Sequence, residues 1–117
     1  MNEDDRELTF KFIYLPLVRK VMEQDLIKIR QAGLKFESPY MTLIENKILQ
    51  ISKEIGMIKR EMMKRSLSVY ENRREIQSEA TSVLKYLIVC RGYREEFNPD
   101  TILVKNNVEK IMRTYFI

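Results

Sequence analysis

The longest regular hydrophobic pattern in the chain lies between residues 39 and 66. Apolar residues recur there at alternating spacings of three and four positions, which is the period of one face of an α-helix. The pattern predicts a single long helix, and we refer to its apolar face as the seam. The seam consists of Met41, Ile44, Ile48, Ile51, Ile55, Ile58 and Met62.

Three shorter stretches also carry helix patterns, at about 16–32, 72–91 and 99–115. Gly33 and Gly92 stand where glycine often ends a helix, and Asn98 stands before Pro99 as a helix N-cap would. Only three glycines and three prolines occur, and no repeat or linker divides the 117 residues. The sequence therefore predicts one all-α domain over 1–117, a small four-helix bundle with a long central second helix.

The N-terminal part of the chain is harder to assign. Leu8, Phe10, Phe12 and Tyr14 alternate with other residues as in a strand, yet Pro16 and the first predicted helix follow directly. Residues 8–15 are therefore either an extension of the helix interrupted near Pro16, which we favour, or a short irregular or extended segment such as an edge strand. Residues 1–7 carry an acidic cluster, and we expect them to be disordered and solubilising.

The seam has two interpretations. A helix over 39–66 is about 40 Å long, more than the other predicted helices can cover end to end. Either the whole seam belongs to the core of one bundle, or part of it faces a second copy of the chain. The leading hypothesis from the sequence is a non-enzymatic protein-interaction or regulatory module that assembles as a homodimer through this helix or binds another protein.

A second hypothesis concerns nucleic acid. Residues 48–67 could form a helix-turn-helix with Gly56 at the turn, but the seam passes through Gly56 without a change of phase, which favours a continuous helix. The net charge is +4, and residues 59–74 are basic. Such a run is usually a solvated helix face, and phosphate contact is the alternative. The candidate contacts are Lys59, Arg60, Lys64, Arg65, Arg73 and Arg74.

The composition argues against catalysis. The chain has no histidine, and Cys90 is its sole cysteine, so the commonest general base and the usual helical metal motifs are missing. We predict no enzyme activity, no metal and no cofactor.

No apolar run approaches the roughly 20 residues that cross a bilayer, so we expect no membrane partner and a cytoplasmic location. At the C-terminus, Tyr115, Phe116 and Ile117 are apolar enough that we expect all three to pack.

Overall fold

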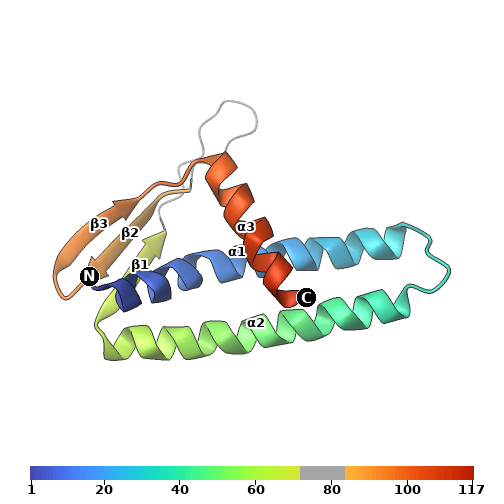
Figure 1. Ribbon diagram of the computed structural model, residues 1–117, viewed down its shortest axis with the longest axis horizontal. Coiled ribbons are helices and arrows are strands. Elements are labelled where there is room, and N and C mark those ends of the chain that lie inside the picture. The colour runs from blue at the N-terminus through green and yellow to red at the C-terminus, as the bar shows by residue number, and fades with distance from the viewer. Residues whose placement is uncertain (72–83) are drawn as a thin grey trace.

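A computed structural model describes residues 1–71 and 84–117 of the chain. The order of elements is α1 (Glu3–Gln31), α2 (Ser38–Lys64), β1 (Leu67–Glu71), β2 (Tyr86–Cys90), β3 (Tyr93–Phe97) and α3 (Thr101–Tyr115). Figure 1 shows α1 and α2 as a long antiparallel hairpin, with the strands at one end and α3 crossing near the middle. The fold is therefore mixed α/β, and the prediction of an all-α four-helix bundle is wrong.

The three strands form one antiparallel sheet in the order β1-β2-β3. Along β2, residues alternate between buried and half-buried positions, and Tyr86, Ile88 and Cys90 point into the core. The sequence predicts a helix over 72–91. Residues 86–90 are instead a strand, so this prediction is wrong there, and residues 72–83 lie outside the described residues. Five apolar residues with adjacent β-branched Ile88 and Val89 suit a central strand better than a helix.

Gly92 belongs to a tight turn between β2 and β3, not to a helix end. Arg91 and Gly92 both have positive φ, 47° and 89°, as the two central residues of a type I′ hairpin turn require. Cys90 pairs with Tyr93 across this turn. The polar stretch after Gly92, which contains no strand pattern of its own, thereby becomes an edge strand.

Helix α1 begins much earlier than the sequence suggests. The side chain of Asn2 accepts a hydrogen bond from the backbone N–H of Asp5, and the Asp5 side chain accepts one from the N–H of Asn2. This reciprocal cap starts the helix at Glu3, so residues 8–15 are helical, as the favoured alternative predicts, and residues 1–7 are not a disordered tail. Pro16 lies inside the helix without ending it. Burial of neighbouring Tyr14, Leu15 and Val18 offsets the hydrogen bond that proline cannot donate.

Helix α2 runs through Gly56 without interruption, which confirms the continuous-helix prediction and excludes a helix-turn-helix turn at that position. The seam faces the inside of the chain. Ile51, Ile58 and Met62 are buried, and Ile44, Ile48 and Ile55 pack against the same core.

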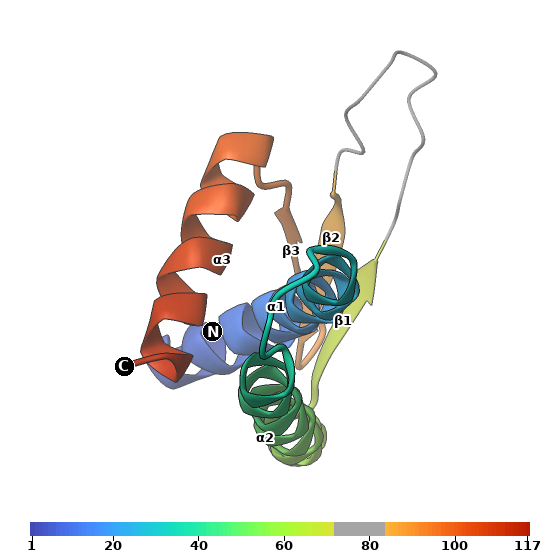
Figure 2. The same cartoon turned by 90° about the vertical axis from the view of Figure 1, so that its right-hand side faces the viewer.

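Figure 2 shows α1 between α3 on one side and the sheet on the other. The Asn107 amide of α3 donates to the Tyr14 hydroxyl of α1 at 3.1 Å, and the Tyr115 hydroxyl donates to Glu54 of α2 at 2.7 Å. These bonds fix α3 across the hairpin. Only Tyr115 of the three C-terminal residues is buried; Phe116 is partly exposed and Ile117 fully exposed, so the expectation that all three pack is wrong.

Candidate interaction surface

A cluster around Asp5 holds the strand end of the molecule together. Its carboxylate is 1% exposed and accepts from Arg65 Nη1 at 3.3 Å and from Arg91 Nη2 at 3.0 Å. Arg65 ends α2 and Arg91 lies in the β2–β3 turn, so one side chain joins α1, α2 and the sheet. We call this the Asp5 clamp. Each buried carboxylate oxygen has a charged donor, as a buried charge needs.

The clamp also sets the ionisation of its members. The hydrogen bond from Arg91 is the main reason that the pKa of Asp5 lies below its ordinary value. The N–H of Asn2 and the guanidinium of Arg65 act in the same direction, whereas burial opposes them. Because the bonds favour the charged form, Asp5 is a structural carboxylate and not a poised general acid.

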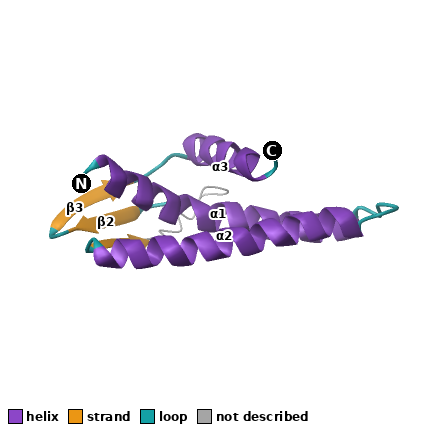
Figure 3. Cartoon of the chain, turned by 60° about the horizontal axis from the view of Figure 1, so that its bottom comes forward, coloured by secondary structure: helices purple, strands orange, loops and turns teal. Residues whose placement is uncertain are grey.

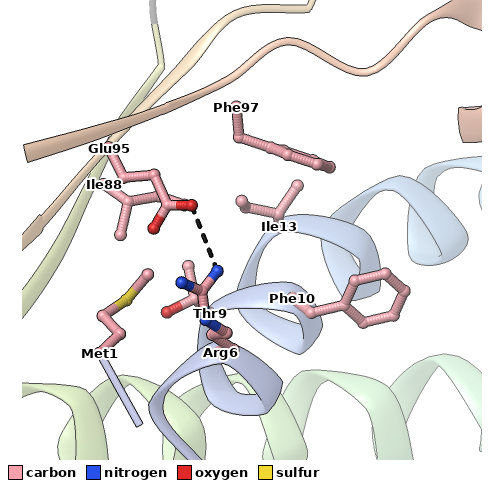
Figure 4. Close-up of a pocket in the computed structure, with 8 residues that line it drawn as sticks. All are labelled: Met1, Arg6, Thr9, Phe10, Ile13, Ile88, Glu95 and Phe97. Atoms are coloured by element: carbon pink, nitrogen blue, oxygen red, sulfur yellow. Dashed lines mark hydrogen bonds and ion pairs between the residues drawn. The ribbon is translucent and has the colours of Figure 1, made fainter. Parts of the chain in front are cut away.

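A small pocket of about 130 Å³ lies beside the clamp, between the first turns of α1 and the sheet (Figure 4). Phe10, Ile13 and Phe97 form much of its apolar lining. Its two charged side chains, Arg6 and Glu95, form an ion pair with each other at 3.2 Å. That pair fastens β3 to α1 and leaves the pocket without an unpaired charged side chain.

The other end of the molecule is organised differently. Residues 23–50, the outer parts of α1 and α2 with their connecting loop, include no buried residue. We call this segment the arm. Figure 3 shows it extending past α3, away from the sheet. A two-helix hairpin on its own has little core, so most of its side chains remain in contact with solvent.

The end of the arm is apolar. Leu34 and Phe36 lie in the loop, Tyr40 in the first turn of α2 and Leu43 one turn later, and all four are exposed, Phe36 to 69%. We call these four residues the arm tip. Single exposed apolar residues are ordinary, but a group of aromatic and aliphatic side chains at one end of a molecule is typical of an interaction surface.

The predicted nucleic-acid contacts are only partly brought together. Lys59, Arg60 and Lys64 are exposed on α2, whereas Arg65 is held by Asp5 and by Glu61 at 3.1 Å. The remaining two candidates, Arg73 and Arg74, lie outside the described residues. Arg65 therefore has a structural role that the sequence analysis missed.

The sequence pattern did not predict the ordered N-terminus or the exposed arm tip. Asn2 and Asp5 have the spacing of a helix cap, which was the available signal for an ordered N-terminus. The arm tip had no comparable signal, because its exposure depends on how far α3 reaches along the hairpin.

In the described part of the chain, no group of three or more His, Cys, Asp or Glu residues could hold a metal ion. None of the described helices combines the length and apolarity that a membrane crossing requires.

The fold and its surfaces define a small α/β protein in which a helical hairpin covers one face of a three-stranded antiparallel sheet and projects beyond it. A family model described as YhjD protein matches residues 1–117, so the chain belongs to this family. It is 27% identical over 120 residues to the Bacillus subtilis (strain 168) protein named "Uncharacterized protein YhjD", covering 100% of this chain and 92% of that protein. No solved structure matches the chain.

Proposed function

We propose that the chain is a non-enzymatic protein-interaction module that assembles as a homodimer through its arm, with the arm tip contributing most of the apolar contact. The observation that carries the proposal is the arm itself: residues 23–50 include no buried residue and end in the exposed arm tip. Covering the tip removes aromatic and aliphatic surface from water, at roughly 25 cal/mol per Å². A partner on the arm therefore gains a hydrophobic contact that the isolated chain lacks.

The position of the seam narrows where such a partner can bind. Its buried members already pack inside the chain, so a partner meets other residues of α2. Tyr40 and Leu43, which lie outside the seam, are exposed and available. The proposal thus places the contact at the outer end of α2 and in the adjoining loop, outside the buried part of the seam.

Two features of composition support a non-enzymatic, cytoplasmic protein. The sequence lacks histidine, the side chain most often used as a general base near neutral pH. Cys90 is a free, buried thiol, which suits a reducing compartment.

Nucleic-acid contact is the alternative function. Lys59, Arg60 and Lys64 are exposed within two turns of α2 and could meet phosphates. Binding of that kind should be weak, independent of sequence and lost as salt rises. A gel-shift titration at two salt concentrations with a duplex and a scrambled control tests it.

Sedimentation velocity tests the main proposal. The full chain, of mass 14.1 kDa, should shift towards twice that mass between low and high micromolar concentration. Phe36→Ser should keep the protein monomeric over a wider range. Tyr93→Ser is the matched control, because Tyr93 is 79% exposed but lies on the sheet. A wild-type chain that stays monomeric throughout would refute self-association.

A further inference from the structure

The arm tip has a surface of suitable chemistry elsewhere on the same chain. Where α3 crosses the hairpin, side chains of α1, α2 and α3 line a groove of about 520 Å³. Phe10, Leu15 and Ile111 supply apolar walls. Glu7 and Glu54 supply two carboxylates and Lys11 one cation, so the charged side chains of the lining carry a net negative charge. We call it the central groove. Its volume is large enough to accept an aromatic side chain and part of a neighbouring turn.

The groove carries a carboxylate that is not neutralised. Glu54 accepts hydrogen bonds from the Tyr115 hydroxyl at 2.7 Å and the Gln50 amide at 3.4 Å, both uncharged donors. Within the described residues it forms no ion pair. Glu7 pairs with Lys11 at 3.4 Å, but both side chains are more than half exposed, so this pair is weak.

The arm tip is flanked by charges of the opposite sign. Lys28 and Arg30 lie in the last turn of α1, and Lys35 lies beside Phe36, with its ammonium 5.5 Å from the ring centroid. None of the three forms an ion pair with another described residue. Tip and groove therefore match in two respects, because apolar side chains face apolar walls and cations face carboxylates.

The separation of the two surfaces suits a closed dimer. Tyr40 and Glu54 lie on the same straight helix, 14 residues apart by their numbers, or about 21 Å. Two copies with antiparallel arms related by a two-fold axis can each insert a tip into the other's groove. The contact is then made twice, once by each tip in the groove of the other copy, so the apolar surface removed from water is doubled.

We propose that the arm tip of one copy docks into the central groove of a second copy, and that each copy does so in turn. The inference rests on the proposed self-association and specifies its geometry. Phe36 is the apolar anchor and Lys35 meets the acidic edge of the groove at Glu7 and Glu54. The apolar contact supplies affinity, and the charges fix which end of the arm enters the groove.

A charge exchange tests this geometry by sedimentation of the full chain at low salt. Lys35→Glu alone and Glu7→Lys alone should each weaken the dimer roughly fivefold, because each places like charges together. The double variant carries both reversals and should bind more tightly than the two single losses added together predict, although recovery stays partial because Glu54 keeps its charge. Lys59→Glu, an exposed reversal on the other half of α2, is the matched control and should leave the dimer unchanged.

The outcomes separate the two proposals. In one outcome, the wild type dimerises while the loss of dimer affinity in the double variant equals the two single losses added together. In that case the tip binds elsewhere and the docking geometry is wrong. If the wild type never dimerises, self-association and docking both fail. If the monomer instead sediments with vesicles containing anionic lipid, and Lys35→Glu abolishes that binding, the tip recognises a membrane surface and the docking proposal is overturned.

Discussion

Ile51 offers the most direct test of the arrangement of α2. Its side chain is fully buried in the core, whereas Leu49, two residues earlier on the same helix, is 61% exposed. The structure thus assigns opposite environments to two apolar residues of nearly equal size. The apolar spacing places Ile51 in the seam and Leu49 outside it, and the structure shows how deeply each side chain is buried.

The expected magnitudes follow from burial. Ile51→Ala removes buried carbons at a site with no exposure and should destabilise by about 3 kcal/mol. Ile51→Val removes one methylene and should cost about 1 kcal/mol. For a domain of this size, 1 kcal/mol corresponds to about 4 °C, so the melting temperature should fall by about 12 °C and 4 °C. Leu49→Ala should change stability by no more than about 0.5 kcal/mol.

Thermal unfolding followed by circular dichroism at low protein concentration provides the measurement, since dimer formation then contributes little. Chemical denaturation should rank the three variants in the same order. Two results would show that α2 does not bury this face. One is an equal loss of unfolding free energy for Ile51→Ala and Leu49→Ala, and the other is a loss below about 1 kcal/mol for Ile51→Ala.

Other predictions concern backbone geometry, acid stability and the anchor of α3. Gly56→Ala should raise stability by about 0.5–1 kcal/mol, because the added methyl meets no atom within 4 Å in mid-helix. The same change at Gly92 should lower stability by about 1–2 kcal/mol, because φ is positive there; melting temperatures compare the two. Asp5→Asn should destabilise at neutral pH but not in strong acid. Because the pKa of Asp5 is lowered in the folded chain, its ionised carboxylate stabilises the fold at pH values above its ordinary pKa. This stabilisation is lost as the pH falls through the lowered pKa, so the melting temperatures of the wild type and Asp5→Asn should converge in acid. Tyr115→Phe should cost about 1 kcal/mol through loss of the Glu54 bond, whereas deleting the two residues after Tyr115 should leave the melting temperature unchanged.

The parts of the fold that the sequence predicts well are those with long periodic patterns. Helix α2 repeats its apolar spacing over many turns, and Pro39 marks its start, so its bounds are predicted to within two residues. Helix α3 is equally clear, although Asp100 caps it rather than Asn98. In both helices the local pattern and the tertiary environment agree.

The strands are a different case. A buried run of five apolar residues such as Tyr86–Cys90 fits a core helix or a central strand, and periodicity does not separate the two. β3 contains mostly exposed residues and exists because β2 offers it a hydrogen-bonding partner, so its own residues carry no signal. The Asp5 clamp and the arm tip could not be predicted for a related reason, because both depend on contacts between distant parts of the chain. The Asp5 clamp joins residues 86 positions apart, and the arm tip is exposed only because α3 lies elsewhere.

The Asp5 clamp has a consequence for the order in which the chain folds. The α1–α2 hairpin depends on contacts between neighbouring segments, which can form as soon as both helices have been synthesised. The bonds of the clamp form later, because Arg65 lies 60 residues after Asp5 and Arg91 lies 86 residues after it. During synthesis, Asp5 can therefore pair with Arg65 once α2 is complete, but it lacks the bond from Arg91 until the β2–β3 turn emerges. Residues at the very start of the chain thus reach their final bonds only after most of the chain has been made.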